Sequence, residues 1–74
     1  MKIIVETGAW AARYTQRELT LDMPEKSTVA DAVRAAKIPE DEAGIAVIDG
    51  KAVMGDYVLS DGDVLRIHPV IIGG

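Results

Sequence analysis

The sequence contains no cysteine and no phenylalanine, and it has a single histidine and a single tryptophan. Without cysteine, the chain cannot form disulfides, thiolate zinc sites or cysteine-ligated iron–sulfur clusters, and it has no cysteine nucleophile. His68 alone cannot build a multi-histidine metal site. Since 49% of the 74 residues are apolar and only three are aromatic, we expect one small domain with an aliphatic core.

Signals for phosphate binding and for membranes are also missing. Before residue 73 every glycine stands singly, so neither a G-x-G-x-x-G fingerprint nor a P-loop exists. No apolar run approaches the roughly 18 residues of a membrane span. No charged-then-apolar signal begins the sequence. We therefore expect a cytoplasmic protein without a membrane partner.

The polar residues do not suggest catalysis by the chain itself. His68 falls on the outward face of an expected strand, with no acid–base partner nearby in sequence. Ser27 and Thr28 are better explained as helix caps than as nucleophiles. The Asp61-Gly62-Asp63 triplet has too few ligands for an EF-hand and is interpreted as a turn. We expect no catalytic residue, no metal site and no cofactor bound by the chain.

The charge is unevenly distributed. The formal net charge is −4, and residues 40–63 hold seven acidic residues against Lys51 alone. An acidic face argues against nucleic acid, which is bound through clustered Lys and Arg. It suits docking on a basic protein surface. The alternative is that these acids only keep a small domain soluble.

Hydrophobic periodicity predicts two strands near the start of the chain. Residues 2–6, "KIIVE", form a short β-branched run typical of a central strand buried on both faces. Residues 17–23, "RELTLDM", alternate strictly and indicate a half-solvated strand nearer an edge. Between them, Trp10 and Tyr14 stand one helical turn apart. Trp10 is interpreted as a cap on the open end of the core, with contact to a partner as the alternative.

A helix with both ends marked follows Pro24. Thr28 and Asp31 resemble a capping box. An apolar stripe comprises Val29, Ala32, Val33 and Ala36. Arg34 and Lys37 suit the last turn, and Ile38-Pro39 ends the helix.

The second half predicts short strands joined by turns. Asp49-Gly50 lies between two apolar arms, which is a strong hairpin signal. A turn at residues 60–63 precedes "VLRIHPV", in which Leu65 and Ile67 face inward. Because Pro69 cannot donate to a ladder, pairing should stop there. One helix packed on one small mixed sheet is the simplest arrangement, so we predict an α+β roll.

The last residues are the most informative. Three branched apolar residues, Val70, Ile71 and Ile72, precede Gly73 and Gly74. Without Cβ atoms, a terminal Gly-Gly can enter a narrow channel and present its carboxylate to a nucleotide. We expect residues 1–70 to form the domain and residues 71–74 a flexible tail. Gly74 is the predicted reactive end. The partner-binding segment comprises Val70, Ile71, Ile72 and Gly73.

Over its full length the chain resembles the MoaD/ThiS family of ubiquitin-like β-grasp sulfur carriers. The resemblance rests on the "KIIVE" strand, Leu59, Asp61-Gly62-Asp63, the alternating strand with Pro69, and the terminal Gly73-Gly74. It implies a ubiquitin-like β-grasp roll whose first and last strands are parallel neighbours at the centre of the sheet.

The resemblance also implies a reaction carried out by partners. An E1-like adenylyltransferase would use ATP and magnesium to convert the Gly74 carboxylate to an acyl-adenylate. Sulfur from a sulfur donor enzyme would displace AMP and leave a thiocarboxylate, from which a sulfur-accepting synthase subunit would take the sulfur. The chain would then be a carrier, or the small subunit of a synthase, and not an enzyme by itself.

Several alternatives stay open. Molybdopterin-type carriers often have Phe in the first strand and a Pro-Pro pair where this chain has His68 and Pro69. Thiamine-type carriers usually have a shorter first hairpin. The Pro69 tail and the long hairpin favour the molybdopterin type. The chain could instead be a ubiquitin-like modifier conjugated to lysines, or a β-grasp binding module with no covalent role.

Overall fold

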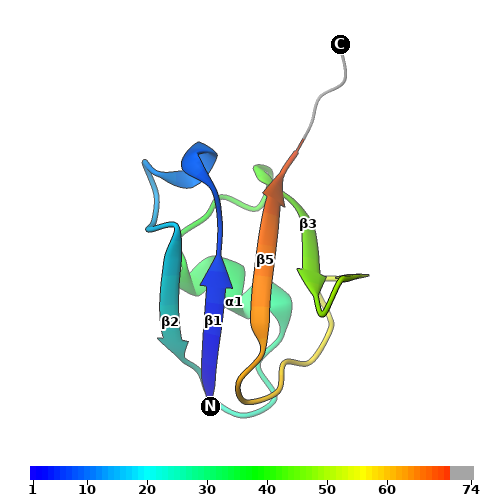
Figure 1. Ribbon diagram of the computed structural model, residues 1–74. Helices are drawn as coiled ribbons and strands as arrows, with labels where there is room; N and C mark the ends of the chain where they lie inside the picture. The colour runs from blue at the N-terminus through cyan, green and yellow to red at the C-terminus, as the bar shows by residue number, and fades with distance from the viewer. Residues whose placement is uncertain (71–74) are drawn as a thin grey trace.

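The computed structural model describes residues 1–70, which form one five-stranded mixed sheet with one α-helix packed on it (Figure 1). The elements are β1 (Lys2–Glu6), the 3₁₀ turn η1 (Ala9–Ala11), β2 (Glu18–Asp22), α1 (Val29–Ala35), β3 (Ala43–Ile48), β4 (Lys51–Val53) and β5 (Val64–Pro69). The strand order across the sheet is β2-β1-β5-β3-β4. The predicted α+β class is therefore confirmed.

The first and last strands form the centre of the sheet. β1 and β5 are parallel, with Val5 opposite Leu65 and Glu6 opposite Arg66. β2 and β3 extend this pair on either side as antiparallel neighbours. The central parallel pair that the resemblance implied is confirmed, and the ends of β1 and β5 point the same way (Figure 1).

The helix begins as the sequence predicts. The Thr28 side chain accepts a hydrogen bond from the Asp31 backbone N–H at 3.3 Å, and the Asp31 carboxylate accepts one from the Thr28 N–H at 2.9 Å. This capping box satisfies two of the donors that a helix start leaves free. The backbone of Lys37 turns to a positive φ of 64° just after the helix.

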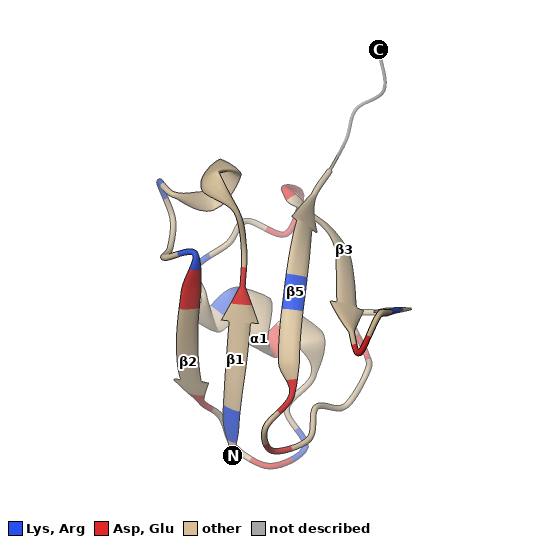
Figure 2. Ribbon diagram, in the orientation of Figure 1, with Lys and Arg blue, Asp and Glu red and all other residues tan. Residues whose placement is uncertain are grey.

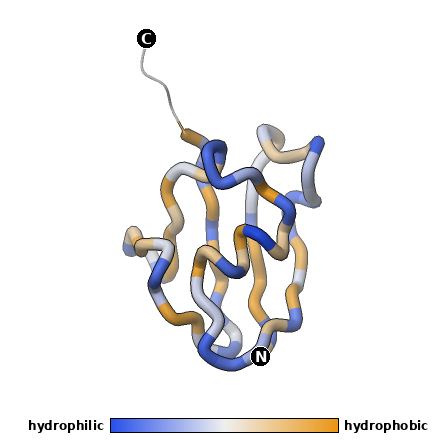
Figure 3. The backbone as a smooth tube through the Cα atoms, turned by 180° about the vertical axis from the view of Figure 1, so that it is seen from behind, coloured by the Kyte–Doolittle hydropathy of each residue, from blue (hydrophilic) through white to orange (hydrophobic). Residues whose placement is uncertain are grey.

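The core lies between α1 and one face of the sheet. Ile3, Val5 and Leu65 are fully buried beneath the helix. All four residues of the predicted helical stripe are buried as well, namely Val29, Ala32, Val33 and Ala36. Seen from behind, the helix crosses the strands and apolar residues follow the backbone beneath it (Figure 3).

The expectation that β1 is buried on both faces is only half correct. Ile3 and Val5 face the helix, but Ile4 is only partly buried. No element within residues 1–70 covers the outer face of the sheet, because the single helix can cover only one side. β2 alternates as predicted and is an edge strand.

Both predicted turns are present. Asp49 and Gly50 have φ values of 53° and 77°, as a two-residue hairpin between β3 and β4 requires. Gly62 has a φ of 86° in the turn before β5. Within residues 1–70, no helix is long and apolar enough to cross a membrane.

Candidate functional site

The predicted tail follows the end of β5. Pro69 is the last residue of β5 and lies opposite Ala43 at the start of β3. Beyond it, the Val70 N–H donates to the Glu42 carbonyl oxygen at 3.3 Å. The Val70 side chain is 45% exposed. The remaining predicted site residues, Ile71, Ile72, Gly73 and Gly74, lie outside the described residues, so their predicted roles stay predictions.

A hollowed surface surrounds this point. Around Pro69 lie a hollow of about 500 Å³ with Ile45 and Val70, and one of about 230 Å³ with Trp10 and Val70. Another of about 230 Å³ has Trp10 and His68 in its lining. We call this the tail-root surface, and its residues are Trp10, Ile45, His68, Pro69 and Val70.

Trp10 connects the tail-root surface to the core. It is partly buried and packs against the core cluster, as expected of a cap on the open end of the core. It also lines two of the hollows beside Pro69. The alternative of partner contact therefore stays a prediction.

Glu42 holds the loop of η1 against the start of β3. The Tyr14 hydroxyl donates to the Glu42 carboxylate, and the Glu42 carbonyl oxygen accepts from Val70. The hydrogen bond to Glu42 raises the pKa of Tyr14 above its ordinary value of 10.0, because ionised tyrosine could no longer donate it. Tyr14 and Glu42 are the site residues that sequence reasoning missed as a pair.

The acidic residues do not form the single face that the sequence suggested. Asp41 and Glu42 lie at the tail end, where they line one hollow together with Pro69, whereas Glu40 pairs with Arg34 of α1. Asp61 and Asp63 lie at the opposite end, where β5 begins (Figure 2). A strand separates the two groups, because β5 runs the length of the sheet. Asp41 and Glu42 remain a local acidic border of the tail-root surface.

The residues considered for other chemistry have structural roles. The Asp61 Oδ1 accepts from the Lys2 N–H at 2.7 Å, and the Asp63 Oδ2 accepts from the Ser60 N–H at 2.8 Å. The Asp63 contact closes the predicted turn, and the Asp61 contact joins that turn to the start of β1. Thr28 is the helix cap, and His68 is exposed on the outer face of β5. Residues 1–70 contain no cluster of three or more His, Cys, Asp or Glu side chains suited to a metal ion.

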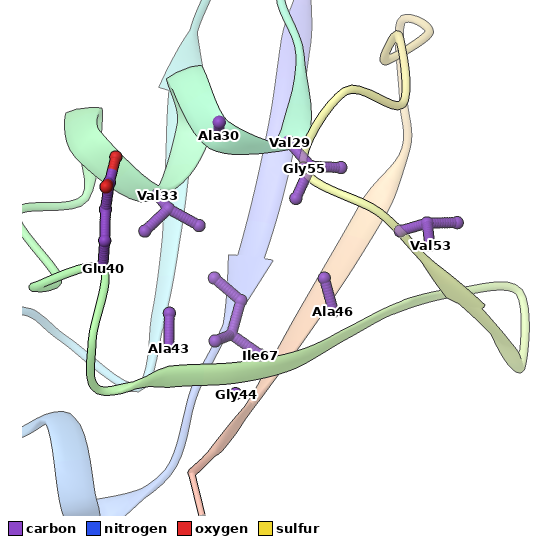
Figure 4. A pocket seen from close by; sticks show the side chains of 10 residues that line it. All are labelled: Val29, Ala30, Val33, Glu40, Ala43, Gly44, Ala46, Val53, Gly55 and Ile67. Atoms are coloured by element: carbon purple, nitrogen blue, oxygen red, sulfur yellow. The ribbon is translucent and has the colours of Figure 1, made fainter.

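A separate apolar cavity of about 180 Å³ lies between α1 and strands β3 and β4 (Figure 4). Val29, Val33, Val53 and Ile67 line it, and Glu40 is the only ionisable residue in its wall. One exposed carboxylate without a partner acid, base or nucleophile in the wall does not make a catalytic site.

The family comparison covers most of the chain. The model of the family described as Mut7-C ubiquitin matches residues 10–72. No curated protein sequence matches the chain significantly.

Solved structures with this fold come from archaea and a eukaryote. The crystal structure of SAMP1 from Haloferax volcanii has a TM-score of 0.76 at 19% identity, and 100% of both chains is covered. A Pyrococcus furiosus protein named as molybdopterin converting factor, subunit 1, has a TM-score of 0.79 at 23% identity, covering 96% of this chain and 99% of that one. Urm1 from Trypanosoma brucei has a TM-score of 0.70 at 20% identity, covering 99% and 95%. The predicted ubiquitin-like β-grasp fold, and the resemblance behind it, are confirmed.

Proposed function

Because the chain belongs to the Mut7-C ubiquitin family, we propose that it is a sulfur carrier whose Gly74 carboxylate is activated by a partner. The observation that supports this most is the placement of Val70. The chain leaves the central strand between two apolar hollows, and the sequence Ile71-Ile72-Gly73-Gly74 follows. The sheet thus presents the start of a segment whose last two residues, Gly73 and Gly74, have no side chains.

The chemistry divides between carrier and partner. The Gly74 carboxylate attacks the α-phosphate of ATP, pyrophosphate leaves, and an acyl-adenylate forms. A hydrosulfide equivalent then adds to the acyl carbon and AMP leaves, so that one carboxylate oxygen is replaced by sulfur. A carboxylate is a poor electrophile, so the nucleotide, the magnesium ion and the pocket that stabilises the transition state belong to the E1-like adenylyltransferase. The carrier contributes recognition and an unobstructed end.

The tail-root surface fits the recognition step. It offers exposed apolar groups, Ile45 and Val70, beside the acidic border of Asp41 and Glu42. We propose that the activating enzyme binds it with an apolar patch next to basic residues. Charge complementarity of this kind mainly raises the association rate and weakens with salt.

Intact mass measurement tests the function. The full chain is incubated with the E1-like adenylyltransferase of the same organism, ATP, magnesium and a cysteine desulfurase with cysteine, together with dithiothreitol, which reduces the desulfurase persulfide to hydrosulfide. We expect the mass to change by the exchange of one oxygen for sulfur. A chain lacking Gly73 and Gly74 serves as the control and should not change. If the full chain is neither adenylated nor sulfurated, the proposed function is wrong.

For the recipient of the sulfur, we propose the molybdopterin type. The likeness to the Pyrococcus furiosus protein and the Pro69 tail support this choice. The thiocarboxylated chain should transfer sulfur when mixed with a molybdopterin synthase large subunit and its precursor. Transfer only with a thiazole synthase would instead place the chain in thiamine synthesis.

A protein modifier is the second candidate, because the fold also matches a protein named small archaeal modifier protein 1, with a TM-score of 0.75. In this case the amine of a lysine displaces AMP and forms an isopeptide bond with Gly74. Trypsin would cut after Arg66 and leave residues 67–74 on the modified lysine. Peptides carrying this remnant in digests of cells expressing the chain would support conjugation, and their absence would oppose it.

A further inference from the structure

Gly44 lies unusually close to the start of the tail. A Cβ atom added to Gly44 would stand 2.6 Å from the Pro69 carbonyl oxygen, 2.7 Å from its carbon and 2.8 Å from the Val70 nitrogen. These are backbone atoms of a neighbouring strand, and they cannot rotate away as the end of a flexible side chain can. The missing side chain at Gly44 therefore allows this close approach.

The other described glycines behave differently. At Gly55, an added Cβ would meet only the Ala30 Cβ at 3.6 Å, an ordinary contact. At Gly8 it would meet the Trp10 side chain. At Gly50 and Gly62 it would meet nothing within 4 Å. The close approach to a backbone is thus specific to Gly44 among the glycines of residues 1–70.

An irregularity in the sheet explains why the approach occurs there. Ala46 pairs with Ile67 and Ala43 pairs with Pro69, so β3 has one more residue than β5 between these pairs. Such a β-bulge bends the strand that carries it and re-aims the chain nearby. Gly44 lies inside the bulge, two residues after Glu42, whose carbonyl oxygen accepts the hydrogen bond from the Val70 N–H.

We propose that Gly44 is a positioning residue: by lacking a Cβ, it lets the Pro69–Val70 backbone lie against β3 and so sets the position of Val70, the residue before the predicted tail. This inference rests on the proposed function, since the position matters for delivery of Gly74 to the activating site. A substitution must push Pro69 and Val70 outward. The preceding part of β5 stays paired with both β1 and β3, so the displacement is confined to the start of the tail.

The test compares Gly44→Ala with the matched control Gly55→Ala in the full chain. Hydrogen exchange at the Val70 amide reports the placement of the tail start, independently of any enzyme. Pyrophosphate exchange with the E1-like adenylyltransferase gives kcat and KM for activation of Gly74. Because a misplacement of about 1 Å can lower a rate about 100-fold, we expect Gly44→Ala to lower kcat at least about tenfold. KM can rise as well, because Pro69 and Val70 also belong to the tail-root surface, but the positioning role requires the fall in kcat.

A second pair of variants tests the placement of the tail start even if Gly44→Ala does not fold. Val70→Pro removes the N–H that bonds to Glu42, whereas Val70→Ala keeps it. Val70→Pro should have the lower kcat of the two.

The outcomes are separable. Faster Val70 exchange and a lower kcat in Gly44→Ala, with neither in Gly55→Ala, support the inference. Equal exchange and equal kcat in the two glycine variants overturn it, as does a loss that appears only in KM. A wild-type chain that is never adenylated contradicts the proposed function itself, whereas unchanged Val70 exchange in Gly44→Ala contradicts only the positioning role.

Discussion

At the scale of single residues, Glu42 joins three parts of the chain. Its carboxylate receives the Tyr14 hydroxyl from the loop after η1, and its carbonyl oxygen receives the Val70 N–H. The first contact fixes a side chain and the second fixes the backbone at the start of the tail. Because both hydrogen bonds depend on the position of Glu42, a substitution at Tyr14 can change the position of the Val70 backbone.

Tyr14 should ionise at higher pH than an ordinary tyrosine. The hydrogen bond to Glu42 raises its pKa, so the stabilising contribution is complete below about pH 10 and is lost as the pH rises through the pKa of the folded state. Ultraviolet absorbance of phenolate, followed in a Tyr57→Phe background, gives the titration of Tyr14 alone. Adding Glu42→Gln should move the midpoint back toward 10. An unchanged midpoint in that double variant would contradict the role of Glu42.

The sequence offered no signal for the Tyr14–Glu42 contact. The two residues are 28 positions apart and lie in segments that the periodicity leaves irregular. For Gly44 a signal was present, because a glycine within an apolar strand often marks a bulge or a close approach of backbones. By contrast, the inward positions of Leu65 and Ile67 followed directly from alternation in the strand.

At the scale of elements, α1 illustrates local and tertiary contributions. The capping box satisfies the N–H groups of Thr28 and Asp31. The N–H groups of the two residues between them are satisfied from outside the helix. The N–H groups of Val29 and Ala30 donate to the carbonyl oxygens of Tyr57 and Gly55 at 3.0 and 2.9 Å. With only seven residues, the helix would be marginal in isolation and depends on the sheet for its stability.

Removing the cap should destabilise the domain measurably. Thr28→Ala deletes the hydroxyl that accepts the Asp31 N–H, and we expect the free energy of unfolding to fall by about 1 kcal/mol. Urea denaturation followed by Trp10 fluorescence measures the change. Thr28→Ser keeps the hydroxyl and should retain most of the stability, so equal losses in the two variants would argue against capping.

The same cap should make stability depend on acid pH. Hydrogen bonds from Thr28, with a smaller contribution from Arg34, lower the pKa of Asp31 below its ordinary value of 3.8. A lowered pKa in the folded state contributes stability above the unfolded value, which is lost as the pH falls through the folded value. Between about pH 5 and pH 2, the urea midpoint of wild type should therefore fall more than that of Asp31→Asn. Parallel curves would mean that Asp31 contributes nothing to acid sensitivity.

Element types were predictable because their signals are local. The alternation in β2 and β5, the stripe of α1 and the Asp49-Gly50 turn depend on neighbours within a few residues. The bulge between Ala43 and Ala46 was not predicted, since it exists only relative to β5. Burial of the second face of β1 was overestimated, because a run of β-branched residues does not reveal how many layers cover a strand.

At the scale of the whole molecule, the aliphatic core has little stability to spare. A single core in a domain of this size contributes only about 3–5 kcal/mol. Leu65→Ala removes a fully buried side chain from the central strand and should cost about 2–5 kcal/mol. We expect the variant to be largely unfolded at 37 °C, as circular dichroism would show.

The neighbouring residue supplies the control for that substitution. Val64 is in the same strand and 36% exposed, so Val64→Ala should lose much less stability and remain folded. Similar losses in the two variants would mean that strand propensity, and not burial beneath α1, decides the stability of β5.

The overall topology followed from a resemblance carried by scattered residues, because periodicity alone does not give the order of strands. The parallel pairing of β1 with β5 is confirmed, and with it the location of the tail start at the end of the sheet. The roles of Ile71, Ile72, Gly73 and Gly74 depend on chemistry with a partner, which no folding argument supplies.

The pairing of β1 with β5 also has a consequence for synthesis on the ribosome. Residues 2–6 emerge long before residues 64–66, yet one side of this strand finds its hydrogen-bond partners only there. The middle of the sheet cannot close until residues 64–66 have been translated, and products of earlier termination keep an unpaired apolar strand that is prone to aggregation and degradation. Any molecule that has reached the native state has therefore been translated at least as far as β5, the strand that precedes the predicted tail.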